Sequence, residues 1–113
     1  MLTIDTLREY GADVDAGLQI CMNNEGFYLK MVNMMIQDNA VDRLKDSIEA
    51  NDLDAAFEAA HALKGVTGNL SLTPILNPVK EITEFLRART EMDYSDLLGE
   101  IVTQRDRLAS LAE

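Results

Sequence analysis

Residues 52–71 read DLDAAFEAAHALKGVTGNLS and contain His61, the only histidine of the chain. The stretch opens on an aspartate, a typical helix N-cap, and continues with helix-forming residues, which predicts a helix from Leu53 to about Leu70. Two glycines, Gly65 and Gly68, nevertheless lie within it. Each glycine in a helix interior costs roughly 1 kcal/mol relative to alanine, so this pair requires an explanation.

The positions of the side chains around this helix predict an exposed histidine. At 100° per residue with His61 at zero, the opposite side of the helix carries only apolar residues. This predicted core stripe consists of Ala56, Ala59, Leu63, Val66 and Leu70. We therefore expect His61 to point into solvent rather than into the core of the protein.

The two glycines fall on the histidine side of the helix. Gly65 follows His61 by four residues and Gly68 follows it by seven, so all three share one stripe. Without side chains at these positions, a second protein can approach the imidazole closely. The alternatives are close packing against another helix or simple tolerance of the glycines, and a position opposite the apolar stripe weakens this interpretation.

Two further residues flank the histidine at helical spacing. Lys64 is its surface neighbour at three residues, and an ammonium there attracts negative charge that arrives on the imidazole. Histidine can act as a covalent nucleophile, and phosphoryl transfer depends largely on positioning and charge stabilisation. Phe57, one turn earlier, is either a docking contact or a residue covered by the segment Ile4–Tyr10, and the sequence leaves both open.

The remainder of the chain is also predicted to be helical. A long helix is expected over Glu25–Ala50, because apolar residues recur in it at three- and four-residue spacing. The polar stretch 37–40 allows a bend, and the methionine-rich run MVNMMI at 31–36 is interpreted as core filling. The other expected elements are short helices at Ile4–Tyr10 and Val14–Met22, a turn at 74–77, a helix from Pro78 to about Arg89, and a last helix to about Ala112 that is capped by Asp93 or Ser95.

Long helices joined by short breaks favour antiparallel neighbours. The expected fold class is all-α, an up-down-up-down four-helix bundle with a short N-terminal helical cover. The 113 residues suit one domain with one core, and no internal repeat or flexible linker divides them. Residues 1–113 are therefore predicted to form a single domain.

Composition excludes several classes of function. The formal net charge is −10, which makes nucleic acid and anionic membranes poor partners. With one histidine and one cysteine, and no suitable carboxylate spacing, no metal site and no cofactor are expected. The first residues lack the pattern of a signal peptide, and no apolar run has the ~20 residues of a membrane span, so a cytoplasmic location is expected.

The run AHALKG at 60–65, followed by Gly68, resembles the signature of histidine-containing phosphotransfer (HPt) domains of multistep two-component phosphorelays. The upstream stretch SIEANDLDAAFEAAH is similar to that family's break between its second and third bundle helices. The resemblance covers roughly residues 14–112, and the length and the midway position of the histidine agree with it.

The resemblance implies a function for each residue of the motif. His61 would accept a phosphoryl group on Nε2 from an aspartyl phosphate of a receiver domain, and would pass it to another receiver. Lys64 would stabilise the phosphate, and Gly65 and Gly68 would provide clearance for the receiver. Magnesium and most of the catalytic groups belong to the receiver in this family, so the chain would be a carrier and not an enzyme, without the ATP-binding domain of a kinase.

The sequence also departs from the family pattern. Ser71 stands where many members have glycine, and Thr83 stands where many have glutamine near the phosphate. Thr83 could still donate one hydrogen bond, and Lys80 and Arg87 flank it at helical spacing and could add positive charge. A bundle that serves only as a protein-interaction module, without phosphorylation, stays open as the alternative to phosphotransfer.

Overall fold

The structure is a computed structural model that describes all residues 1–113. It is entirely helical, which confirms the predicted fold class. Its helices are α1 (Ile4–Tyr10), α2 (Val14–Ile20), α3 (Glu25–Gln37), α4 (Ala40–Glu49), α5 (Leu53–Asn69), α6 (Thr73–Arg87) and α7 (Ser95–Leu111).

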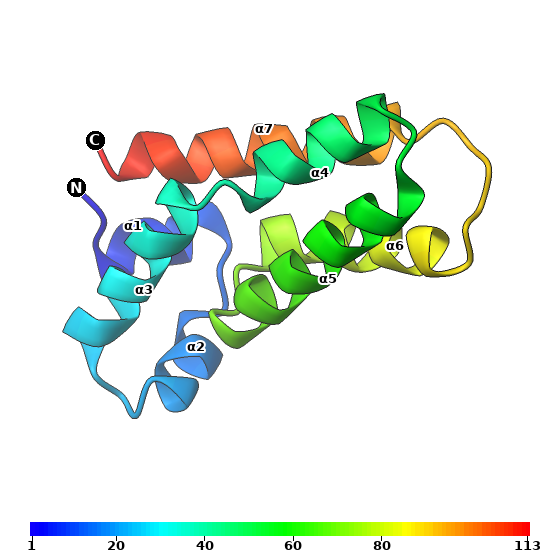
Figure 1. Cartoon of the computed structure of the whole chain (residues 1–113). Coiled ribbons are helices and arrows are strands. Elements are labelled where there is room, and N and C mark those ends of the chain that lie inside the picture. Colours follow the sequence, from blue (N-terminus) through cyan, green and yellow to red (C-terminus); the bar gives the residue numbers. More distant parts are fainter.

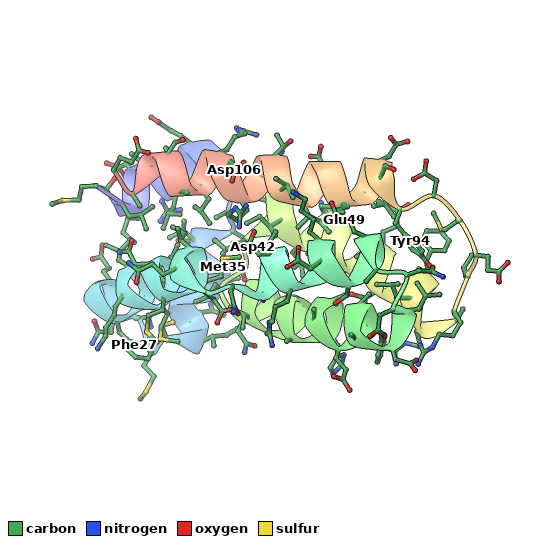
Figure 2. The ribbon with its side chains drawn as sticks, turned by 45° about the horizontal axis from the view of Figure 1, so that its top comes forward. Phe27, Met35, Asp42, Glu49, Tyr94 and Asp106 are labelled. Atoms are coloured by element: carbon green, nitrogen blue, oxygen red, sulfur yellow. The ribbon has the colours of Figure 1, made fainter.

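Four of these helices form the bundle. α4, α5, α6 and α7 run alternately in opposite directions, and α5 packs between α4 and α6 while α7 closes the bundle against both (Figure 1). α1, α2 and α3 gather at one end and form an N-terminal cover, of which α1 and α2 were predicted and α3 was expected as part of a bundle helix (Figure 1). The molecule is elongated, 41 × 25 × 19 Å, and Phe27 of α3 lies at the opposite end from Tyr94, which precedes α7 (Figure 2).

The long helix expected over Glu25–Ala50 is instead two helices. α3 ends at Gln37 and α4 begins at Ala40, because Asp38 adopts extended backbone angles, φ −70° and ψ 148°. The carboxylate of Asp38 then accepts a hydrogen bond from the backbone N–H of Ala40 at 2.8 Å. A short polar side chain that binds its own backbone in this way competes with the helix, so the polar stretch breaks the helix where only a bend was expected.

The turn expected at 74–77, with a helix starting at Pro78, is also wrong. α6 begins at Thr73 with Pro74 in its first turn and continues through Pro78 to Arg87. Proline removes one N–H donor from a helix, and here the carbonyl that loses its partner belongs to Pro74, at the very start. Pro78 is itself buried, so its ring adds apolar contact with the core.

Two helices, α2 and α5, begin after an aspartate N-cap. Asp13 and Asp52 accept hydrogen bonds from Ala16 and Ala55 at 3.3 and 3.1 Å. The cap of α7 differs in detail: Tyr94 holds the N-cap position, while the carboxylate of Asp93 accepts the N–H of Ser95 at 2.9 Å. The ends of two helices also differ from the prediction, since α2 and α6 each stop two residues before the expected position.

Tyr28 links the N-terminal cover to the end of α5. The hydroxyl of Tyr28, a fully buried residue of α3, donates to the carbonyl of Leu70 at 2.8 Å. Burial raises the pKa of Tyr28 to about 12. Gly17 of α2 lies directly against this tyrosine ring, which brings α2, α3 and the end of α5 together at one point.

Candidate functional site

His61 lies near the middle of α5, on the side of the helix that faces solvent. The buried residues of α5 are Ala56, Ala59, Ala60, Leu63 and Thr67. The side chain of His61 is exposed, as the sequence predicted. The expected core position of Val66 is wrong, because Val66 is 42 % exposed. The buried stripe of α5 is centred closer to Ala60 and Thr67 than the spacing of 100° per residue predicted.

The glycine beside the histidine forms an open surface. A methyl group built on Gly65 would meet nothing within 4 Å, and Gly65 is exposed. Gly68 lies closer to the neighbouring helix, since a methyl group there would approach Leu76 Cδ1 of α6 at 3.9 Å, an ordinary contact distance. Neither glycine is required by helix packing within the chain, so the packing alternative does not account for either of them.

Lys64 is a half-buried neighbour of this surface. No ion pair within the chain includes Lys64 or His61, although five such pairs form elsewhere. The ammonium is therefore not neutralised by a carboxylate of its own chain, and its charge is available to an incoming anion.

Phe57 lies against the histidine on the other side. Its ring and that of His61 are stacked, with centroids 5.7 Å apart and planes 24° from parallel. The guanidinium groups of Arg87 and Arg89 lie over the Phe57 ring at 5.2 and 5.7 Å. The cover of Phe57 thus comes from the end of α6, whereas residues 4–10 lie at the opposite end of the bundle (Figure 1).

The other predicted residues of α6 do not all reach this surface. Thr83 is fully buried, and its hydroxyl donates to the carbonyl of Val79 at 2.6 Å. It therefore has no free donor to offer a phosphate group on the surface. Lys80 and Arg87 are both exposed, and Arg87 is paired with Glu84 at 3.0 Å.

An apolar hollow of about 220 Å³ opens between α5 and the region where α3 ends and α4 begins, and the sequence reasoning missed it. The methionine spacing in 31–36 was interpreted as core filling, which holds for Met35 but not for Met34, which is 54 % exposed. The signal that could have found the hollow is the polar break at 37–40, since a break there separates α3 from α4 and leaves the methionines uncovered. Its lining comprises Met31, Met34, Met35, Asp38, Ala40, Val41, Arg43, Ala62, Leu63 and Val66.

No group of three or more histidine, cysteine, aspartate or glutamate side chains is arranged to hold a metal ion. None of the helices combines the length and the apolar character needed to cross a membrane.

Comparison with known protein families agrees with this geometry. A family model described as the Hpt domain matches residues 30–111, most of the chain. The chain belongs to the Hpt domain family. Neither the curated proteins nor the solved structures gave a match.

The matched region holds all four bundle helices together with the greater part of α3. Hpt domains carry phosphoryl groups in the histidine phosphotransfer steps of phosphorelays, act with receiver domains, and have no kinase activity of their own.

Proposed function

We propose that His61 is the phosphoacceptor of a phosphorelay, which takes a phosphoryl group from the aspartyl phosphate of one receiver domain and passes it to another. Residues 1–113 would act as one domain, a carrier without turnover of its own. The observation that carries the proposal is the exposed imidazole of His61 on a helix face where Gly65 leaves open space to beyond 4 Å.

The chemical step needs little from this chain beyond position. The lone pair of the Nε2 atom of His61 forms a bond to phosphorus while the bond from phosphorus to the receiver's aspartate oxygen breaks. The aspartate leaves as a carboxylate, and the Nδ1 atom keeps its proton. The return step to a second receiver reverses these bond changes on a new aspartate, so the carrier ends unchanged.

Lys64 has the role of charge partner in this proposal. Phosphoryl transfer spreads negative charge over the oxygens of the moving group, and a nearby cation stabilises that charge. Lys64 lies one turn beyond His61, half-buried and without an ion pair, which supports this role. Gly65 and Gly68 provide the clearance that a receiver needs to bring its aspartate to the imidazole.

The apolar hollow supports docking of a folded partner beside the histidine. Val66 and Met34 expose apolar surface there, and Ala62 connects the hollow to the helix face that carries His61. Contiguous exposed apolar surface on a small domain marks an interaction site more often than isolated apolar residues do.

The test compares His61→Gln with the wild type and with Glu58→Gln, a control at an exposed position one turn earlier on α5. Each purified protein is incubated with a phosphorylated receiver, and the transferred label is tested for acid lability and base stability. We expect such label on the wild type and on the control, and none on His61→Gln. Because His61 is exposed, the free energy of unfolding in urea should change by less than about 0.5 kcal/mol.

Two outcomes would contradict the proposal in different ways. Label that persists on His61→Gln would show that another residue is the acceptor. A wild type that takes no label from any receiver of its organism would favour the alternative, a bundle that only binds partners.

A further inference from the structure

The stacked pair of Phe57 and His61 gives the imidazole a fixed neighbour on an otherwise open surface. Side chains on a helix lean towards its N-terminus, so His61 leans over the turn that carries Phe57. The centroid distance of 5.7 Å lies within the range in which aromatic rings attract each other. An exposed imidazole without such a neighbour would exchange freely among its side-chain rotamers.

Phe57 is in turn held by two arginines from the end of α6. Both guanidinium carbons lie less than about 6 Å from the ring centroid, the range in which a cation is attracted to an aromatic face. Phe57 therefore touches the histidine of α5 and the arginines of α6 at once, and it is only half-buried.

The arginines are themselves anchored. Arg89 pairs with Asp54 of α5 at 2.6 Å and donates to the carbonyl of Leu86 at 2.7 Å. Arg87 pairs with Glu84 at 3.0 Å. Asp54 precedes Phe57 by three residues on the same face of α5. Arg89 therefore contacts α5 twice, through the ion pair with Asp54 and through the ring of Phe57, which in turn stacks on His61.

From this geometry we propose that Phe57 is a positioning residue for phosphoryl transfer, and that Arg87 and Arg89 hold it in place. The inference rests on the proposed function of His61. Transfer requires the ring nitrogen to lie in line with the breaking bond, and small misplacements of a reacting group slow a reaction strongly. Phe57 acts by keeping the imidazole in one orientation before the receiver arrives.

The test separates positioning from docking, the role that the sequence left open for Phe57. Single-turnover transfer from a phosphorylated receiver is measured over a range of receiver concentrations. For Phe57→Leu we expect a roughly three- to tenfold lower maximal rate at an unchanged half-saturating concentration. Phe57→Tyr keeps the aromatic ring and should restore the wild-type rate.

Two arginine variants provide a matched pair. Arg89→Gln removes one cation from the Phe57 ring and should lower the maximal rate by a smaller factor, about twofold. Arg107→Gln is the control, because the guanidinium of Arg107 lies over the ring of Tyr10 at 5.5 Å, a similar contact far from the histidine. It should transfer at the wild-type rate.

A readout without any receiver reports on the imidazole itself. His61 is the only histidine, so its ring protons give unique NMR signals. In the wild type and in Phe57→Tyr, we expect contacts between those protons and the ring of residue 57, and shifts caused by the stacked ring. Phe57→Leu should lose the shifts, while its urea midpoint shows that it remains folded.

The outcomes assign failure clearly. If the wild type takes label and Phe57→Leu reaches the same maximal rate, the positioning role is wrong and the proposed function stands. If the loss lies wholly in the half-saturating concentration, Phe57 is a docking contact instead. If the wild type takes no label, both proposals fail, whatever the NMR signals show.

Discussion

Two helical glycines of this chain, Gly17 in α2 and Gly65 in α5, lack a side chain for opposite reasons. A methyl group on Gly17 would lie 2.6 Å from Cε1 of Tyr28 and 2.8 Å from the carbonyl oxygen of Leu70, whereas one on Gly65 would meet nothing within 4 Å. The fold therefore requires Gly17 and has no use for Gly65. Gly99 of α7 is equally open, so openness alone does not set Gly65 apart. What points to a partner outside the molecule is that Gly65 lies one turn from the exposed His61.

The largest effect is expected for Gly17→Ala. The new methyl group would collide with backbone at Leu70, which cannot move aside as a flexible side chain could, and with the Tyr28 ring that bonds to that same carbonyl. Overpacking of this kind should lower the free energy of unfolding by about 2–3 kcal/mol, measured by urea denaturation.

The matched control for that variant is Gly99→Ala in α7. A methyl group on Gly99 meets nothing within 4 Å, so this variant should gain stability from helix propensity alone. If Gly17→Ala were as stable as the wild type, α2 could shift at no cost, and the contrast between the two glycines would disappear.

The intermediate effect concerns Gly65 itself. Gly65→Ala should raise the free energy of unfolding by up to about 1 kcal/mol, because alanine favours the helix and the site is open. Gly65→Gln, with its larger side chain, should keep most of the wild-type stability but weaken receiver binding, measured by calorimetry, by about tenfold, a difference of about 1.4 kcal/mol.

Gly99→Gln provides the control for binding, since it places the same side chain on an open position of another helix. Wild-type affinity in Gly65→Gln would show that the open surface is not used for docking. The proposal for His61 would then have to rest on the exposure of the imidazole alone.

The contrast also shows what could be predicted from the sequence. The orientation of His61 and the open surface at Gly65 could be predicted because they depend only on residues of α5, namely its N-cap and the helical spacing of its side chains. The need for Gly17 depends on Tyr28 and Leu70, two residues outside α2 that meet Gly17 only in the folded bundle. No spacing rule within α2 contains that information.

The errors within the site have the same origin. Val66 lies at the edge of the apolar stripe, and only the break between α3 and α4 leaves it open to the hollow. The buried hydroxyl of Thr83 and the arginines over Phe57 depend on how α6 packs against α5. The helical spacing of residues within α5 predicted which of its faces carries His61. The packing of the other helices against α5 determines which side chains surround that face.

Ser71, just after α5, is the opposite case to Gly65, because here the backbone favours glycine and the chain has another residue. Its replacement is expected to have the smallest effect on stability. Its φ of 54° lies in the left-handed region, where glycine is favoured and other residues are strained, yet the chain has serine there. Ser71→Gly should raise the free energy of unfolding by about 0.5 kcal/mol, since relief of strain is partly offset by the greater freedom of glycine in the unfolded chain.

Asn51→Gly is the matched control for Ser71→Gly. Asn51 has a nearly identical φ of 56°, but asparagine adopts the left-handed region more readily than serine, so its replacement should gain less. Equal gains at both positions in urea denaturation would mean that unfolded-state and local solvation effects dominate over backbone strain. A larger gain at Ser71 would show that the backbone at the end of α5 is strained in this chain. Two residues that lower the stability of the fold, Gly65 and Ser71, would then lie four and ten positions after the histidine.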